Sequence, residues 1–302
     1  MDKIKKGVMW KNRNLLYKNE VNGDMKISNN IDEKVVNGFG QEWSRFDQSQ
    51  LNDKELYHMF SAYFTIFPWN KLPKNSVGFD LGCGSGRWAK FAAPRVGTLY
   101  CIDPSEEALK VAEKNLKNIN NCRLYNASVD NMPFDDLSMD FGYSIGVLHH
   151  IPDTEAGIKM CVAKLKKDAP FLLYLYYAFD NKPLWYRMIW KLSDGGRVFI
   201  SRMPFPLKYI ISQFIALFIY LPLARLAKLG EIIGLHVDSI PLSFYRNRYF
   251  YTMRTDALDR FGTKLEKRFT KAQILKMMED AGLRNIKFSD KPPYWCAVGE
   301  KS

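Results

Sequence analysis

Short apolar runs alternate with amphipathic segments between residues 77 and 178 of the chain. This alternation is typical of strand–helix units repeated around a parallel sheet. Apolar residues spaced three and four apart predict helices over residues 105–116 and 154–166. The apolar runs predict five strands, at residues 77–81, 98–102, 123–127, 140–145 and 171–177.

The alternation stops after Asp180 and resumes with a capping box at Thr270, which opens a helix that ends at Gly282. Two further strands are predicted at residues 285–289 and 295–299, and a link this short permits only antiparallel pairing. We therefore expect an α/β fold with a mostly parallel, seven-stranded sheet that ends in an antiparallel β-hairpin.

The other segments flank or interrupt this core. Residues 1 to about 37 are rich in Asn, Lys and Asp, and we expect them to pack weakly. Apolar residues at helical spacing over residues 51–67 predict a helical cap before the first strand. The predicted domains are an N-terminal extension with this cap (1–76), a core (77–180 and 270–302) and an insertion (181–269) that we expect to form a substrate lid.

The first strand runs into a glycine-rich turn, residues 80–86 (DLGCGSG). Compared with the G-x-G-x-x-G loop that binds dinucleotides, its third glycine comes one residue early and Arg87 takes that place. Asp80 would repel a pyrophosphate and attract an ammonium group. Asp103 closes the second strand, where a carboxylate can accept hydrogen bonds from both ribose hydroxyls. Together the two acids specify a ligand with a cationic amino end and a ribose, as in S-adenosylmethionine.

This loop resembles that of the class I S-adenosylmethionine-dependent methyltransferases, particularly the small-molecule branch with a methyltransferase type 11-like domain, which includes quinone and sterol enzymes. Residues 131–134 (NMPF), residues 146–150 (GVLHH) and the terminal helix and hairpin match as well. The resemblance implies a Rossmann-like methyltransferase fold with a helical insertion after the fifth strand. It also implies S-adenosylmethionine as the cofactor.

The resemblance further implies a set of cofactor-binding residues. Around the methionyl part it implies Asp80, Gly82, Cys83 and Gly84. Around the ribose and adenine it implies Asp103 and Pro104, and as the floor near the sulfonium it implies Ser144, Ile145 and Gly146. The pair at the adenine edge, often Asp-Ala in the family, is Ser128-Val129 here. A hydroxyl, the backbone or Asp130 would then hold the adenine amino group.

Two histidines directly follow the fourth strand, at the sheet edge where open α/β folds bind ligands. Methyl transfer requires an oriented nucleophile, and a general base when that nucleophile carries a proton. We predict His150 as the base, with His149 as the other candidate, because the resembled family more regularly has histidine at the second position of this pair. The alternative is that both pack under the cofactor or cap the next helix. We expect no metal site.

Charge and aromatic residues indicate where the acceptor binds. The 302 residues carry 44 Lys+Arg against 32 Asp+Glu, and residues 181–254 hold eleven of these cations against three acids. Such an excess suits an anionic acceptor. The predicted acceptor contacts are Trp43, Tyr177, Tyr245, Arg246 and Arg248, each with packing or a solvated surface as the alternative.

An apolar stretch at residues 210–221 lies inside the insertion. Twelve residues are too few to span a bilayer, so we expect a buried lid helix. The alternatives are peripheral membrane contact through residues 199–228 and binding of a lipid-linked acceptor. Five widely spaced cysteines without a CxxC pair, and the lack of a secretory signal, lead us to expect a cytoplasmic protein, with the inner membrane face as an alternative site.

The sequence therefore predicts methyl transfer to an oxygen, less readily a nitrogen, of a small or lipid-linked acceptor such as a sugar, a glycan or a quinone-like metabolite. A non-catalytic cofactor-binding scaffold or a membrane-associated interaction protein is the alternative. A nucleic-acid substrate ranks third, because residues 144–147 (SIGV) lack the Pro-Pro loop with which base methyltransferases hold an exocyclic nitrogen.

Overall fold

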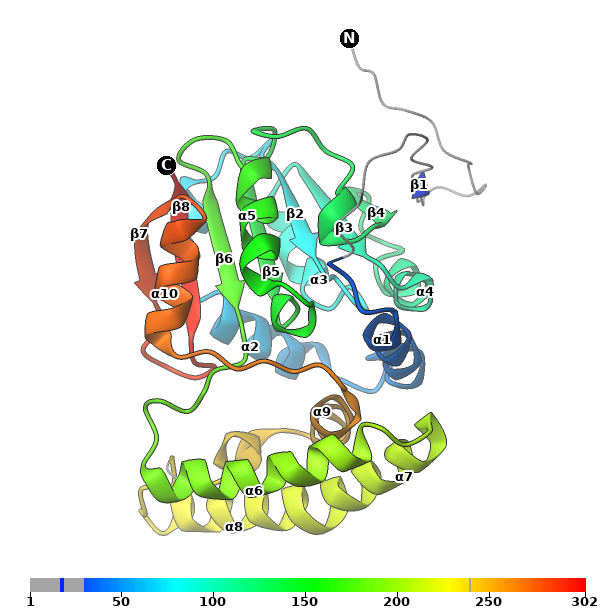
Figure 1. Cartoon of the computed structure of the whole chain (residues 1–302), viewed down its shortest axis with the longest axis vertical. Coiled ribbons are helices and arrows are strands. Elements are labelled where there is room, and N and C mark those ends of the chain that lie inside the picture. Colours follow the sequence, from blue (N-terminus) through cyan, green and yellow to red (C-terminus); the bar gives the residue numbers. More distant parts are fainter. Residues whose placement is uncertain (1–16, 19–29, 239) are drawn as a thin grey trace. The chain divides into compact units, whose positions relative to one another are not determined.

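The computed structural model describes residues 17–18, 30–238 and 240–302. The chain forms two compact units (Figure 1). The first, which we call the sheet unit, comprises Met1–Ser44, Leu56–Ala178 and Leu265–Ser302. The second, the helical unit, comprises Arg45–Glu55 and Phe179–Lys264.

The sheet unit contains an eight-stranded sheet in the order β1-β4-β3-β2-β5-β6-β8-β7. The strands from β1 to β6 pair in parallel, and β8 runs antiparallel to both β6 and β7, so the predicted hairpin is confirmed. All seven predicted strands are present, and β1 adds two residues at the β4 edge. The bounds are β1 Tyr17–Lys18, β2 Val77–Leu81, β3 Thr98–Asp103, β4 Cys122–Asn126, β5 Phe141–Ile145, β6 Pro170–Tyr174, β7 Leu283–Phe288 and β8 Cys296–Lys301.

Helices pack on both faces of this sheet because side chains alternate along each buried strand. Leu172 joins the cluster formed with α2, α3 and α4, and Leu173 joins the cluster formed with α5 and α10. The helix bounds are α1 Glu33–Arg45, α2 Asp53–Tyr63, α3 Ala89–Ala92, α4 Glu106–Asn115, α5 Thr154–Lys164 and α10 Lys271–Asp280, with the predicted capping box at Thr270.

Helix α1 corrects the expectation of weak packing for residues 33–37, whereas residues 1–16 and 19–29, to which the same expectation applied, lie outside the described residues. Asp32 accepts hydrogen bonds from the backbone N–H groups of Lys34 and Val35 at 2.9 and 3.2 Å. This cap starts the helix, and burial of Val35 and Glu42 then holds it against the rest of the protein. Tertiary packing therefore outweighs the polar composition of the segment.

The helical unit is built from α6 Leu184–Ile200, α7 Phe205–Ile215, α8 Leu221–Ile232 and α9 Phe250–Gly262. A π-helical turn, Ala216–Tyr220, joins α7 to α8 without a break, which gives one helix of 28 residues, Phe205–Ile232. By length and composition alone this helix is long enough and apolar enough to cross a membrane. It is longer than the predicted apolar stretch of residues 210–221, whereas the expectation that the stretch does not span a bilayer stays a prediction. The π-helical turn ends two positions before Pro222, whose ring would clash with a carbonyl in a regular α-helix.

Candidate active site

The glycine-rich turn lies between the ends of β2 and β3. The backbone N–H groups of Gly82 and Cys83 donate to the carbonyl oxygen of Ile102 at 2.7 and 3.0 Å. Gly84 has φ +53°, and a Cβ added there would lie 2.9 Å from Nε1 of Trp43. The turn therefore requires glycine both for its backbone conformation and because the Trp43 indole lies directly on it.

Asp80 is a buried carboxyl group, only 1% exposed, on β2 just before this turn. Its Oδ2 accepts a hydrogen bond from the Tyr143 hydroxyl at 3.0 Å, and its Oδ1 has no hydrogen-bond partner among the described residues. Burial raises the pKa of Asp80 from 3.8 to about 8, against the lowering effect of Tyr143 and with a further rise from Asp103. A cationic ligand beside Oδ1 would stabilise the ionised form.

Asp103, at the end of β3, is tied to the glycine turn. Its Oδ2 accepts the N–H of Gly84 and its Oδ1 accepts the N–H of Ser105, both at 2.9 Å. Burial raises its pKa to about 6, and the two backbone hydrogen bonds oppose that rise. Each carboxylate oxygen can still accept a second hydrogen bond from a ligand hydroxyl. Pro104 follows, half-buried, and its carbonyl accepts a hydrogen bond from the Asn126 amide.

The predicted adenine-edge pair lies after β4. The Ser128 hydroxyl contacts the Asn131 side chain in a capping box that opens a short 3-10 helix, and Val129 is buried. Asp130 accepts the backbone N–H of Asn30 at 2.8 Å. The Ser128 hydroxyl and Oδ2 of Asp130 thus make contacts within the chain, whereas Oδ1 of Asp130 has no hydrogen-bond partner among the described residues. Which of the hydroxyl, the backbone and Asp130 holds the adenine amino group stays a prediction.

The end of β5 closes the other side of the turn. The hydroxyl of Ser144 donates to the carbonyl oxygen of Leu81 at 3.1 Å, and Ile145 is buried beside it. Gly146 has φ +78° and donates its N–H to the carbonyl oxygen of Tyr174. A Cβ added at Gly146 would meet no atom closer than 4.0 Å, so there is open space next to its backbone.

The two histidines differ in their surroundings. The ring of His149 is fully buried, with its centroid 3.9 Å from those of His150 and Tyr176. Burial, then His150 and Arg268, lower its pKa well below the ordinary value, which favours the neutral ring. Both of its nitrogens lack a hydrogen-bond partner among the described residues, so its role as the other candidate base stays a prediction. Of the two tyrosines just after β6, Tyr176 packs against both histidines, whereas the predicted acceptor contact is Tyr177.

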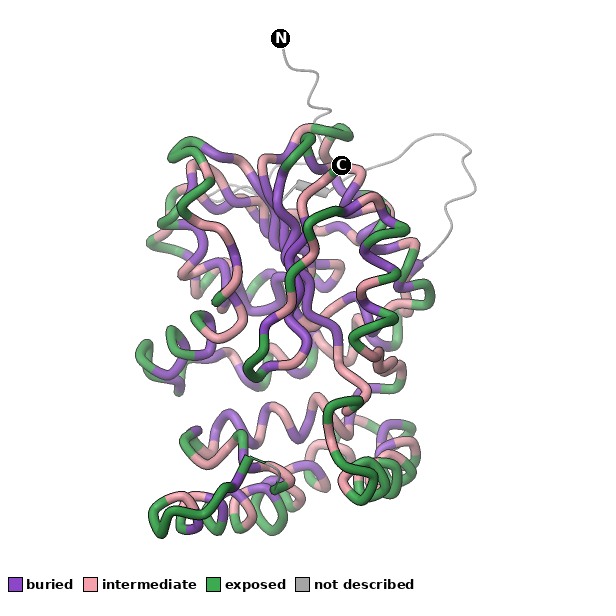
Figure 2. Tube along the Cα trace, turned by 90° about the vertical axis from the view of Figure 1, so that its left-hand side faces the viewer, coloured by how far each residue is buried: buried purple, intermediate pink, exposed green. Residues whose placement is uncertain are grey.

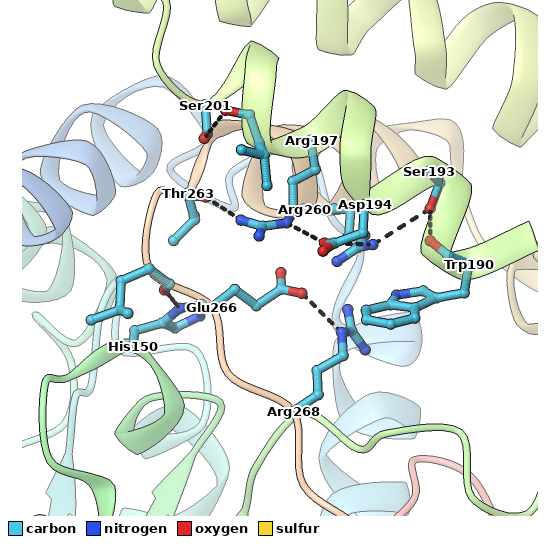
Figure 3. A network of polar contacts seen from close by, with 12 residues as sticks. His150, Trp190, Ser193, Asp194, Arg197, Ser201, Arg260, Thr263, Glu266 and Arg268 are labelled. Carbon is cyan, nitrogen blue, oxygen red and sulfur yellow. Dashed lines mark hydrogen bonds and ion pairs between the residues drawn. The ribbon is translucent and has the colours of Figure 1, made fainter. Parts of the chain in front are cut away.

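His150 instead has a defined tautomer (Figure 3). Its Nδ1 lies 2.7 Å from the carbonyl oxygen of Leu265. Because a carbonyl oxygen can only accept, Nδ1 carries the proton and the neutral ring has its lone pair on Nε2. Nε2 has no hydrogen-bond partner within the described part of the chain. This arrangement fits a general base.

Figure 3 also shows an ion pair on the same segment as Leu265. The Nε of Arg268 lies 2.9 Å from a carboxylate oxygen of Glu266, and its guanidinium is 5.1 Å from the centre of the Tyr176 ring. Tyr177 points elsewhere, with its ring centroid 5.7 Å from that of Tyr294 of the hairpin link. Its role as an acceptor contact stays a prediction.

The three predicted acceptor contacts of the insertion belong to the helical unit. Tyr245 donates its hydroxyl hydrogen to Asp256, and Arg246 forms ion pairs with Glu231 and Asp238 at 2.8 and 3.2 Å. Arg248 is only 8% exposed, and its guanidinium lies 5.1 Å from the centre of the Phe244 ring. The cation of Arg248 thus faces an aromatic ring, whereas that of Arg246 is paired with carboxylates.

Comparison with known proteins adds to this geometry. Residues 79–173 match the family model of a methyltransferase domain, and they include the glycine turn, Asp103 and both histidines. This part of the chain therefore matches a methyltransferase domain. The domain has the Rossmann-like, mostly parallel sheet with antiparallel final strands that the sequence predicted.

Curated relatives match mainly within this methyltransferase domain. An uncharacterised methyltransferase of Bacillus subtilis, YcgJ, is 30% identical over 107 residues, which are 35% of this chain and 42% of that protein. A demethylmenaquinone methyltransferase of Staphylococcus carnosus is 33% identical over 93 residues, 30% of this chain and 38% of that protein. The chain thus spans about two-fifths of the length of these relatives. A solved S-adenosylmethionine-dependent methyltransferase from Thermotoga maritima aligns with 87% of this chain and 100% of its own, at 14% identity and a TM-score of 0.46.

Proposed function

We propose that this chain is an S-adenosylmethionine-dependent methyltransferase that acts on an oxygen of a small or lipid-linked acceptor, such as a sugar, a glycan or a quinone-like metabolite. The observation that supports the cofactor most strongly is the carboxyl group of Asp80. It is buried, its pKa is raised to about 8, and its Oδ1 lacks a partner among the described residues. An ammonium group is the ligand chemistry that would compensate this burial.

The remaining residues of the glycine turn fit the rest of such a cofactor. Asp103 is held by the turn with lone pairs available for ribose hydroxyls, and the open space next to Gly146 leaves room for the reactive end. When bound, S-adenosylmethionine supplies an electrophilic methyl group on a sulfonium. The protein's part is to orient the acceptor, to exclude water and to remove the acceptor's proton.

His150 is the residue that we assign to proton removal. The carbonyl oxygen of Leu265 holds Nδ1 protonated, so Nε2 is available to take a proton from an acceptor hydroxyl. The ring of Phe39, with its centroid 4.9 Å away, packs beside it and limits access of water. A base of this kind supports an acceptor atom that must lose a proton, as a hydroxyl oxygen does.

Two observations support the acceptor class. Relatives from Staphylococcus species are named demethylmenaquinone methyltransferases, which favours a quinone-like acceptor. The buried guanidinium of Arg248, which lies over the Phe244 ring and has no carboxylate partner among the described residues, favours an acceptor with an anionic group, such as an acidic sugar or a phosphate-linked lipid. Release of S-adenosylhomocysteine with a panel of quinols and phosphorylated or acidic sugars would separate these classes.

Calorimetric titration of the full chain with S-adenosylmethionine tests the cofactor assignment. Asp80→Asn should weaken binding roughly tenfold to a hundredfold, because hydrogen bonds to charged groups contribute about 1.5–3 kcal/mol. Asp135→Asn is the matched control, because Asp135 is an exposed acid of the same unit. Equal affinity in both variants would refute the assignment, and tight binding without turnover on any acceptor would favour a non-catalytic scaffold.

A further inference from the structure

The helical unit exposes most of the large hydrophobic side chains that lie on the surface of the described residues. Twenty-two such side chains are exposed, and all except Tyr57 and Leu137 belong to this unit. Figure 2 shows the exposed colouring along its helices. Soluble monomers rarely expose contiguous apolar surface on this scale, so this surface requires an apolar partner.

The long helix Phe205–Ile232 buries small residues and exposes bulky apolar ones, the reverse of a typical helix of a soluble protein. Its buried face consists largely of small residues, and it packs on Met253 and Ala257 of α9. The buried small residues are Ser212, Ala216, Ala224, Ala227 and Gly230. Its bulky apolar residues point outward instead, namely Leu207, Ile210, Phe214, Leu217, Phe218, Ile219, Leu226, Leu229 and Ile232.

Helix α6 likewise exposes large apolar side chains. Arg197 is buried, and its guanidinium donates to Asp194 at 2.6 Å and to the carbonyl oxygen of Thr263 at 3.0 Å (Figure 3). Leu184 and Leu192, by contrast, are 68% and 79% exposed. A helix that buries an arginine and exposes leucines is arranged for an apolar environment outside the protein.

Cations accompany the outward apolar residues. Arg187 and Lys191 lie three and seven positions after Leu184, so they share its face of α6, and both are exposed. The acids of residues 184–233 are Asp194 and Glu231, and both are already ion-paired within the unit. Residues 184–233 therefore carry an excess of cations over the two ion-paired acids.

We propose that the outer face of α6 and of the helix Phe205–Ile232 docks on an anionic lipid bilayer. Apolar side chains with a basic rim match the acyl boundary and the anionic headgroups, respectively. A second copy of the chain fits less well, because a symmetric contact would bring Arg187 and Lys191 towards their own copies. The docked surface lies outside the methyltransferase domain, so this proposal does not depend on the proposed reaction.

The helix lies in the interface and does not span the bilayer. Its uncharged part runs from Tyr209 to Ala224, and sixteen residues cover about 24 Å, less than the ~30 Å of a hydrocarbon core. Its inner face packs on α9, which carries Arg254 and Asp256. Insertion across the membrane would draw these charges into hydrocarbon, whereas interfacial binding leaves them in water.

Flotation of the full chain with vesicles tests this proposal. The vesicles are phosphatidylcholine alone or phosphatidylcholine with 30% phosphatidylglycerol, each at low and high salt. We expect retention only on the anionic vesicles, and less of it as salt rises. The double variant Arg187→Gln and Lys191→Gln, which removes both positive charges, should lower the partition coefficient about 25-fold, or about fivefold per cation. Lys110→Gln with Lys117→Gln makes the same charge change on exposed residues of the sheet unit.

The apolar contribution is tested by Leu192→Ser, with Leu137→Ser as the control, since Leu137 is 60% exposed in the sheet unit. We expect at least a tenfold loss of partition for the first variant and none for the second, with unchanged circular dichroism in both. Absence of binding to anionic vesicles at low salt would overturn the proposal. Resistance to carbonate extraction would overturn it in favour of a spanning helix. A dimer in solution that Leu192→Ser abolishes would assign the face to a second copy.

Discussion

Replacing Asp80 by Asn should make the free protein more stable while weakening its affinity for the cofactor. Asp80 is 1% exposed, and burial raises its pKa from 3.8 to about 8. Between these pH values the unfolded chain carries an ionised Asp80, whereas the folded chain keeps the proton. The folded state therefore binds more protons, and the free energy of unfolding falls as pH rises through this window.

The magnitude follows from the same two values. Each pH unit between 3.8 and 7 costs the folded state about 1.4 kcal/mol, so the accumulated cost at pH 7 is about 4 kcal/mol. Asparagine has nearly the same shape and does not ionise, and it can still accept the Tyr143 hydrogen bond through its side-chain oxygen. Asp80→Asn should thus raise the free energy of unfolding at pH 7 by up to about 4 kcal/mol and should have little effect near pH 4.

Urea unfolding followed by circular dichroism at pH 5, 6, 7 and 8 measures this difference. We expect the gap between Asp80→Asn and the wild type to widen by about 1.4 kcal/mol per pH unit from pH 5 to pH 7. The exposed control Asp135→Asn should show no such trend. A variant that is less stable than the wild type at pH 7, or a gap independent of pH, would refute the reasoning that burial raises the pKa of Asp80.

Three further predictions concern the site. Binding of S-adenosylmethionine should release a proton from Asp80 and tighten from pH 6 to pH 8; calorimetry in buffers of different ionisation enthalpy measures this release, and none at pH 7 would contradict it. His150→Gln should lower kcat by about 10²–10⁴ with cofactor Kd unchanged within twofold, and unchanged turnover would exclude it as the base. Gly84→Ala should destabilise the protein by roughly 1–2 kcal/mol in urea unfolding, because of its positive φ and the contact with Trp43, whereas Gly38→Ala, in open space on α1, should stabilise it by about 0.5–1 kcal/mol.

Periodicity predicted the strands and most helices of the sheet unit because burial on both faces makes each strand a short apolar run. The same signal failed for α1, whose residues become helical through the Asp32 cap and through burial of Val35 and Glu42. Polar composition alone could not reveal that the segment has tertiary partners. Only its one cap residue was a local clue.

The glycine turn and Asp80 were predictable because this loop motif lies within seven consecutive residues, and Asp103 was predictable from its place at the end of the next strand. The contacts that tune these groups were not predictable in this way. Asp80 meets Tyr143 because β2 and β5 pair in a register that sets Asp80 opposite Tyr143, 63 positions later. His150 obtains its tautomer from Leu265, 115 positions away. A base can be suggested from its place after a strand, but its proton position depends on a residue that only the fold brings near.

The insertion shows a different limit of sequence patterns. An apolar stripe at helical spacing indicates that a helix has two faces, and by default the apolar face is assigned to the protein interior. In the helical unit the small residues and Arg197 face inward and the bulky apolar residues face outward. Pro222 also ended the predicted stretch too early, because the π-helical turn before it lets the helix continue to Ile232. The direction of the stripe is therefore decided by which face packs on α9. That packing makes the surface of this unit a candidate for lipid contact.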